Sequence, residues 1–169
     1  MRPFLFLGVL GVLAIGGFFV FSSSKPGTES KILTTPTPQV QAETERRASF
    51  AIFTNGTFRI FTDPKYHNLS DDVYIESTNP NIVRVKKAGI AWNDFFKTLP
   101  MKLTRDCLTT GTGQTFCTSS NGTLKFYLNR ELDQNALDRT INHGDKLLVS
   151  FGGENEQQIQ NQLQQVPEL

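Results

Sequence analysis

The sequence predicts an α+β fold in which a mixed or antiparallel sheet curls over one short helix, an arrangement like a β-grasp. An N-terminal transmembrane helix is expected before this domain and a C-terminal amphipathic helix at its end. Three observations lead to the prediction. Short runs of alternating apolar and polar residues are separated by turn residues, one stretch has helical spacing, and the last stretch carries a narrow apolar stripe.

The composition changes along the 169-residue chain and divides it into four parts. Residues 1–3 are expected to form a short cytoplasmic N-terminus and residues 4–21 a transmembrane helix. Residues 22–46 are rich in Ser, Thr and Pro, which predicts a flexible linker that cannot bury enough apolar surface to fold alone. Residues 47–169 are then long enough for one hydrophobic core, so we expect one extracytoplasmic domain.

Residues 4–21 are apolar or glycine throughout. At a rise of about 1.5 Å per residue, such a helix nearly matches the hydrocarbon core of a bilayer, so the lipid bilayer is its expected partner. A cleaved signal peptide is the alternative, although its apolar region would be about 7–15 residues long and would end in a small-residue site. With either an anchor or a cleaved signal peptide, the domain is expected to be exported. The expected location is the cell membrane, with a single pass and the C-terminal domain outside the cytoplasm.

Two Asn-Gly pairs predict β-hairpins in the domain. Asn55-Gly56 lies between the strand-like runs 49–54 and 57–61, and both central residues of a type I′ turn need positive φ angles, which Asn and Gly adopt readily. Asn121-Gly122 predicts a second hairpin of the same kind. Further strands are expected at 73–75, 82–86, 103–108, 115–118, 124–128 and 146–151.

Two helices are expected in the domain. Ile90 to Leu99 has an apolar side and is followed by Pro100, which predicts one short helix. Residues 154–165 are rich in Gln and carry an apolar stripe that predicts a loosely packed terminal helix. The stripe consists of Ile159, Leu163 and Val166. Residues 133–141 are expected to be irregular or briefly helical.

The chain has two cysteines, Cys107 and Cys117. They flank a predicted hairpin, so their Cα atoms can lie within the distance that a disulfide needs. Export to an oxidising compartment favours a structural disulfide. A redox-active pair is the alternative, although such pairs usually have C-x-x-C spacing at the start of a helix. Two cysteines without a nearby histidine do not complete a metal site.

Two charged groups are candidate binding residues. Three cations at a strand edge could bind an anion, although charged edges more often prevent sheet aggregation. They are Arg84, Lys86 and Lys87. An acidic group in the loops could bind a cation through carboxylate oxygens, although it lacks the D-x-D-x-D-G order of a calcium loop. It consists of Asp71, Asp72 and Glu76, with Asp63 nearby.

The sequence contains no recognisable catalytic set. His67 and His143 lie in polar turns, where a solvated side chain is the expected interpretation, and no G-x-S-x-G motif is present. A net charge of +1 lacks the basic character of a nucleic-acid binder. We therefore expect no catalytic residue, no cofactor and no nucleic-acid partner.

Four stretches give the domain a resemblance to a known family. They are Asn55-Gly56, residues 88–96, residues 144–152 and the Gln-rich end at Val166-Pro167. On these residues, the chain from Ala48 to Val166 resembles an uncharacterised family of membrane-anchored extracytoplasmic domains of uncultivated bacteria and archaea. The resemblance implies the fold and the location given above.

The chain departs from that family at two points. Family members often carry an H-x-H-A strand that would suit a metal ion, whereas residues 84–88 of this chain contain no histidine. Some relatives are called disulfide isomerases, but this chain has no C-x-x-C motif. The resemblance therefore implies neither a metal site nor an isomerase activity here.

The expected function is that of a membrane-tethered extracytoplasmic binding or scaffolding domain of the cell envelope, with an envelope protein as its partner. A thiol-disulfide redox protein that uses Cys107 and Cys117 is one alternative. An ion- or anion-binding domain that uses the charged groups is the other.

Overall fold

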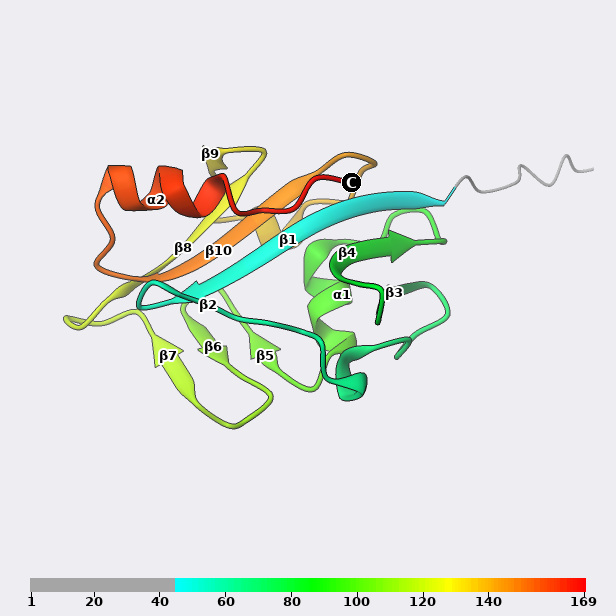
Figure 1. Ribbon diagram of the computed structural model, residues 1–169, viewed down its shortest axis with the longest axis horizontal. Coiled ribbons are helices and arrows are strands. Elements are labelled where there is room, and N and C mark those ends of the chain that lie inside the picture. The colour runs from blue at the N-terminus through cyan, green and yellow to red at the C-terminus, as the bar shows by residue number, and fades with distance from the viewer. Residues whose placement is uncertain (1–44) are drawn as a thin grey trace, which may run out of the picture. The chain divides into compact units, whose positions relative to one another are not determined.

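Two β-sheets and two α-helices make up residues 45–169, the part of the chain that the computed structural model describes (Figure 1). The predicted α+β class is confirmed. The expected N-terminal end, the transmembrane helix at 4–21 and nearly all of the linker at 22–46 lie outside the described residues. Within residues 45–169, no helix is long and apolar enough to cross a membrane.

The larger sheet has the strand order β3-β4-β1-β10-β8-β9, and β2 also pairs with β1. Its central strands, β1 and β10, run parallel in the register Ser49↔Lys146 to Thr54↔Phe151, and every other pair is antiparallel, so the sheet is mixed as predicted. The strands are β1 (Arg46–Thr54), β2 (Thr57–Phe58), β3 (Val73–Glu76), β4 (Asn79–Val85), β8 (Thr123–Leu128), β9 (Glu131–Leu132) and β10 (Lys146–Gly152).

The smaller sheet has the order β5-β6-β7 and is antiparallel. Its strands are β5 (Lys102–Leu103), β6 (Cys107–Thr109) and β7 (Thr115–Cys117). The single strand expected at 103–108 is therefore two strands. The chain turns between them, where the amide of Thr104 donates to the carbonyl of Cys107 at 2.8 Å.

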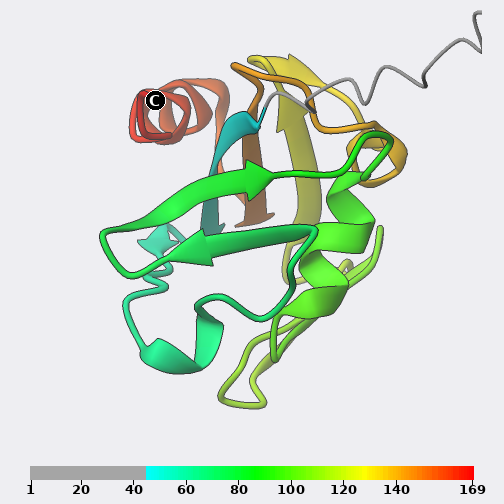
Figure 2. The ribbon, with the colours of Figure 1, turned by 90° about the vertical axis from the view of Figure 1, so that its right-hand side faces the viewer.

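The central strands are buried on both faces because a helix covers each side of the larger sheet. Helix α1 (Trp92–Thr98) and the smaller sheet lie against one face, and helix α2 (Glu156–Leu163) lies against the other (Figures 1 and 2). Side chains alternate along a strand, so Phe50 and Ile52 of β1 face α1 while Ala51 and Phe53 face α2.

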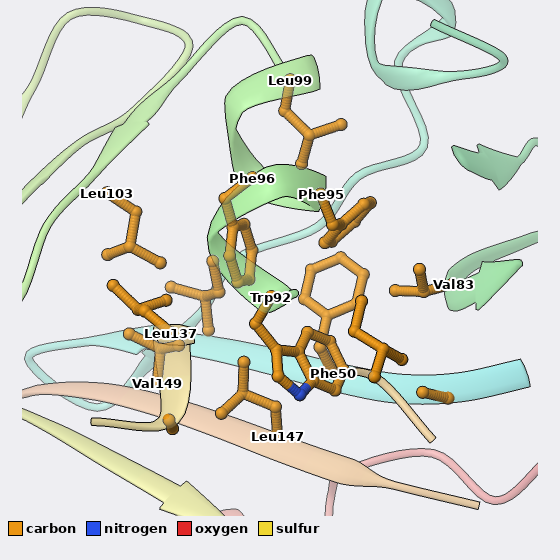
Figure 3. Close-up of a cluster of buried hydrophobic side chains, with 14 of the residues drawn as sticks. Phe50, Val83, Trp92, Phe95, Phe96, Leu99, Leu103, Leu137, Leu147 and Val149 are labelled. Carbon is orange, nitrogen blue, oxygen red and sulfur yellow. The ribbon is translucent and has the colours of Figure 1, made fainter. Parts of the chain in front are cut away.

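Aromatic side chains fill the space between α1 and the sheet. Phe95 and Phe96 lie edge-on to Phe50, with ring centroids 5.3 and 5.8 Å apart, and Trp92 stacks on Phe96 at 6.3 Å (Figure 3). Such pairs stabilise a core by about 0.5–1.5 kcal/mol each beyond their burial. The helix expected from Ile90 to Leu99 is confirmed, with ends one or two residues shorter.

Helix α2 packs more tightly than its narrow apolar stripe suggested. Ile159, Leu163 and Val166 are each no more than 6% exposed, and they pack with Phe53 and Leu148. The helix also begins with a capping box, in which the Asn155 side chain accepts from the Gln158 amide. The expectation of loose packing was wrong because the second face of the sheet is also apolar.

The first Asn-Gly hairpin is confirmed, since Asn55 and Gly56 have φ angles of 50° and 75°. Its second arm is shorter than the predicted 57–61. Strand β4 already pairs with residues 46–49 of β1 on the same edge, so only β2 finds room beside the end of β1. Beyond β2, the ring of Phe61 turns into the core and lies 5.0 Å from that of Phe50.

The second Asn-Gly pair lies in a tight turn, but the turn is shifted by one residue. Ser119 and Gly122 form an isolated antiparallel bridge with backbone hydrogen bonds in both directions, so Ser120 and Asn121 are the central residues. The predicted hairpin centred on Asn121-Gly122 is therefore wrong in its register. Gly122 is absent from the positive-φ residues of the described chain, and strands β7 and β8 belong to different sheets. A Cβ on Gly122 would lie 2.9 Å from the Phe151 ring and 3.1 Å from the Gly152 Cα, so this glycine allows a close crossing of two segments. A two-residue hairpin that was not predicted lies at Asn129–Arg130, which joins β8 and β9 with φ angles of 53° and 74°.

Candidate functional site

Two of the three cations predicted to bind an anion are paired with carboxylates of the protein. Arg84 contacts Glu45 at 2.5 Å and Glu76 at 2.9 Å, and its hydrogen bond to Glu45 raises the pKa of the guanidinium. Lys87 pairs with Asp72 at 3.3 Å. The ammonium of Lys86 lies 4.8 Å from the centre of the Tyr74 ring. Arg84 and Lys87 are thus paired with carboxylates, whereas Lys86 forms no ion pair among the described residues.

The acidic candidates come together with these cations on the hairpin of β3 and β4. Glu76 and Asp72 form the two ion pairs just described, while Asp71 borders a shallow polar hollow beside Lys86. Asp63 instead accepts from the amide of Lys65, which lowers the pKa of its carboxyl. Within residues 45–169, no three His, Cys, Asp or Glu side chains converge as a ligand set for a metal ion.

Cys107 and Cys117 form a disulfide between directly opposed residues of β6 and β7, with their Cα atoms 4.1 Å apart. The predicted bond is therefore present. It closes the base of a hairpin whose tip, Thr110 to Gly113, projects beyond the smaller sheet. The side-chain hydroxyls of Thr110 and Thr112 are hydrogen bonded to each other at 2.9 Å across this tip.

Both histidines are held by the backbone rather than only solvated. The Nε2 atom of His67 lies 2.7 Å from the carbonyl of Phe61, and the Nδ1 atom of His143 accepts from the amide of Arg47 at 3.3 Å. Neither histidine lies beside a nucleophilic side chain with which it shares a hydrogen bond in the described residues. These contacts tie the loops to the fold.

A cavity that the sequence analysis missed lies where β2 ends and the hairpin tip approaches it. Its volume is about 180 Å³, and it opens to the surface. Segments far apart in the sequence enclose it: the chain from β2 to Tyr66, Met101 just before β5, and the hairpin of β6 with its tip, with Ile52 of β1 beneath them. Its lining consists of Ile52, Phe58, Arg59, Ile60, Phe61, Tyr66, Met101, Leu108, Thr110, Gly111 and Thr112.

The floor of the cavity is apolar, and one apolar side chain extends from it into solvent. Ile52, Phe61 and Leu108 are buried in the main core. Ile60 is 67% exposed, the largest exposed fraction among the large hydrophobic side chains of residues 45–169. Single exposed apolar side chains are common on protein surfaces, so it is the position of Ile60 beside the apolar cavity that makes it a candidate contact residue.

Arg59 supplies the positive charge of the cavity. Its Nε donates to the Thr54 hydroxyl at 2.5 Å, and its guanidinium carbon lies 5.3 Å from the centre of the Phe116 ring. These contacts fix the side chain, which is partly buried. In contrast to Arg84, Arg59 forms no ion pair among residues 45–169, so its two terminal nitrogens keep their hydrogen-bond donors free.

Gly111 lets the hairpin tip form the far wall of the cavity. A Cβ on this glycine would lie 2.3 Å from the hydroxyl of Tyr66 and 3.0 Å from the carbonyl of Pro100, so no larger residue fits here without movement. The ring of Tyr66 is in turn held edge-on by Phe61, at 5.1 Å. The width of the cavity therefore depends on the position of the hairpin.

Comparisons of the chain with protein-family models, with curated proteins and with solved structures give no match.

Proposed function

We propose that the domain is a membrane-tethered, extracytoplasmic binding module that recognises a short segment of another cell-envelope protein in the cavity beside β2. Residues 4–21 would anchor it as a single transmembrane helix, and residues 22–46 would hold it at a distance from the bilayer. We further propose that the fold is of β-grasp type. The order β4-β1-β10-β8-β9, with a parallel central pair and α1 against one face, supports that assignment.

The observation that carries the binding function is the joint presence of an apolar cavity, an exposed Ile60 and an unpaired Arg59. The cavity volume of about 180 Å³ is the size of one large side chain, since a cavity of about 150 Å³ can hold benzene. A protein partner would therefore place one apolar side chain in it. Ile60 would add apolar contact at the rim.

The backbone beside the cavity also suits a polypeptide partner. The amide of Arg59 donates to the carbonyl of Ile52 at 2.8 Å, and this bond continues the pairing of β2 for one residue. The next amide, that of Ile60, has no acceptor among residues 45–169. A peptide lying across the mouth of the cavity could hydrogen bond to it.

A random peptide library displayed on phage tests the binding function and does not require the partner to be identified first. The library is selected on the full chain in lipid nanodiscs, with empty nanodiscs as the blank. We expect enrichment of peptides with one large apolar residue. Ile60→Ser should abolish the enrichment, whereas Leu132→Ser should keep it, because Leu132 is similarly exposed at 60% but lies on β9. Selection of no peptide above the blank would contradict the proposal.

The membrane placement needs a separate test. Alkaline phosphatase fused after Leu169 is active only outside the cytoplasm, so a bacterial host that produces the fusion should show activity in a fraction that resists alkaline extraction. An inactive fusion would contradict the proposed orientation. A soluble, active fusion would instead favour a cleaved signal peptide over an anchor.

The thiol-disulfide alternative is supported by the disulfide alone. Neither cysteine begins a helix, and both lie in strands of the smaller sheet, whereas low thiol pKa values usually require a helix N-terminus or a nearby cation. Free-thiol titration of the full chain in glutathione buffers separates the two functions. A disulfide that stays oxidised in these buffers has a structural role. A disulfide that exchanges readily with glutathione would favour a redox function.

A further inference from the structure

We infer that the cavity selects a carboxylate beside the apolar side chain, and that Arg59 is the residue that determines this specificity. The inference rests on the proposed binding function and names the chemistry of the partner. The partner segment would carry one large apolar residue together with an adjacent carboxylate. That carboxylate is either the C-terminus of the segment or the side chain of a neighbouring Asp or Glu.

The guanidinium is held in place before any ligand binds. The Thr54 hydroxyl accepts from Nε, and the guanidinium carbon lies 5.3 Å from the centre of the Phe116 ring. A fixed side chain loses little conformational freedom when a ligand binds, which favours affinity. The two terminal nitrogens stay free, and a planar guanidinium can donate two parallel hydrogen bonds to one carboxylate.

Charge and size together limit the ligand. Arg59 lines the same small cavity as Phe58 and Tyr66, so a ligand in the cavity that also carries an anion could reach the guanidinium. A phosphate or sulfate alone would leave the apolar floor in contact with water. An apolar side chain alone would leave the two terminal nitrogens of the guanidinium without a protein acceptor, and a ligand that provides both groups is complementary to the whole site.

Matched peptide probes test the inference. The full chain in lipid nanodiscs is titrated into fluorescein-labelled Gly-Gly-Ser-Gly-Phe, and anisotropy is followed. The same peptide is used with a C-terminal amide, and a third peptide has glycine in place of the phenylalanine. A fourth, amidated peptide ends in Phe-Asp-Gly and carries its carboxylate on a side chain. Unlabelled 3-phenylpropionate is added as a competitor that has no peptide backbone.

We expect the free-acid peptide to bind roughly 10- to 100-fold more tightly than its amide, because hydrogen bonds to charged groups have this strength. The glycine peptide should bind more weakly than either. In Arg59→Gln, the acid and the amide should bind equally, and Arg59→Lys should restore part of the difference. Arg130→Gln is the matched control, since Arg130 also lacks an ion pair among the described residues but lies in the β8–β9 turn.

The outcomes separate this inference from the proposed function. If acid and amide bind equally to the unaltered chain, and Ile60→Ser weakens both, carboxylate selection is refuted while the binding function stands. If no probe and no selected peptide binds, both are refuted. Competition by 3-phenylpropionate as strong as that of the unlabelled peptide would overturn the protein partner in favour of a free organic acid. Preference for the Phe-Asp-Gly peptide over the free-acid peptide supports the inference and identifies a side-chain carboxylate as the anion.

Discussion

Loss of the Cys107–Cys117 disulfide should lower the free energy of unfolding by about 2.7 kcal/mol. The bond joins residues with a sequence separation of 10. Opening a loop of this length returns conformational entropy to the unfolded chain, and the loop-entropy relation gives the stated value at 25 °C. The folded state should change little, because Leu108 is fully buried and the Phe116 ring lies 5.4 Å from that of Phe151. The hairpin therefore keeps its apolar contacts without the bond.

The assay is guanidinium unfolding of the full chain in nonionic micelles, with Cys107→Ser/Cys117→Ser compared with the unaltered chain. Trp92 is the only tryptophan of the chain and is fully buried beside α1, so its fluorescence reports the unfolding of this domain. With a denaturant dependence of about 4 kcal/mol per molar, the midpoint should fall by roughly 0.7 M.

Reduction of the unaltered chain with a phosphine provides the control. It should lower the midpoint to that of the double variant, and it should leave the variant itself unchanged. An equal midpoint for the oxidised chain and the variant would show that the bond does not restrict the unfolded chain. Loss of cooperative unfolding in the variant would instead show that the buried contacts of the hairpin cannot hold it.

Three further predictions concern the turns and the surface charges. Gly56→Ala should lower the free energy of unfolding by about 1–2 kcal/mol, because Gly56 has a φ angle of 75°. Gly153→Ala should change it hardly at all, since Gly153 has no positive φ and, as at Gly56, an added Cβ would meet no atom within 4 Å. The midpoints of guanidinium unfolding compare the two variants. Arg130→Gly should stabilise the domain by up to about 1 kcal/mol in the same assay, because Arg130 has a φ angle of 74°; a lower midpoint would show that its side chain forms an unrecognised contact. The hydrogen bond from Arg139 lowers the pKa of the Asp133 carboxyl below its ordinary value. The ionised carboxyl therefore stabilises the folded domain at a pH above the ordinary pKa, and this stabilisation is lost as the pH falls through the lower pKa of the folded state. Asp133→Asn should therefore lower the midpoint at pH 7 but not at pH 2, and equal losses at both pH values would contradict the charge pairing.

Local chemistry predicted some turns and failed at others. Asn55-Gly56 forms the predicted hairpin because the strands on both sides belong to one sheet. At the second Asn-Gly pair the turn is instead centred on Ser120-Asn121, and Gly122 lies where the chain passes Phe151. The turn at Asn129–Arg130 gave no signal because arginine rarely adopts a positive φ; the pairing of Leu128 with Glu131 leaves a two-residue loop, which requires that conformation.

The fold class, the disulfide and both helices could be predicted because they depend on spacing along the chain. The cavity could not, since its lining comes from segments that only the folded chain brings together. In the sequence, Arg59 has the pattern of an ordinary polar residue in a strand of alternating apolar and polar residues. One signal was available in the adjacent Ile60 and Phe61, because two neighbouring apolar residues break the alternation at the point where the chain leaves the sheet.

The parallel pairing of β1 with β10 determines when the domain can fold. Ser49 pairs with Lys146, so the two central strands come from opposite ends of the domain. Contacts between residues so far apart in sequence form late and slowly. A growing or translocating chain therefore cannot complete its core until β10 has emerged. A fragment that ends before Lys146 should remain unfolded and open to proteases, however much of the remaining sequence it contains.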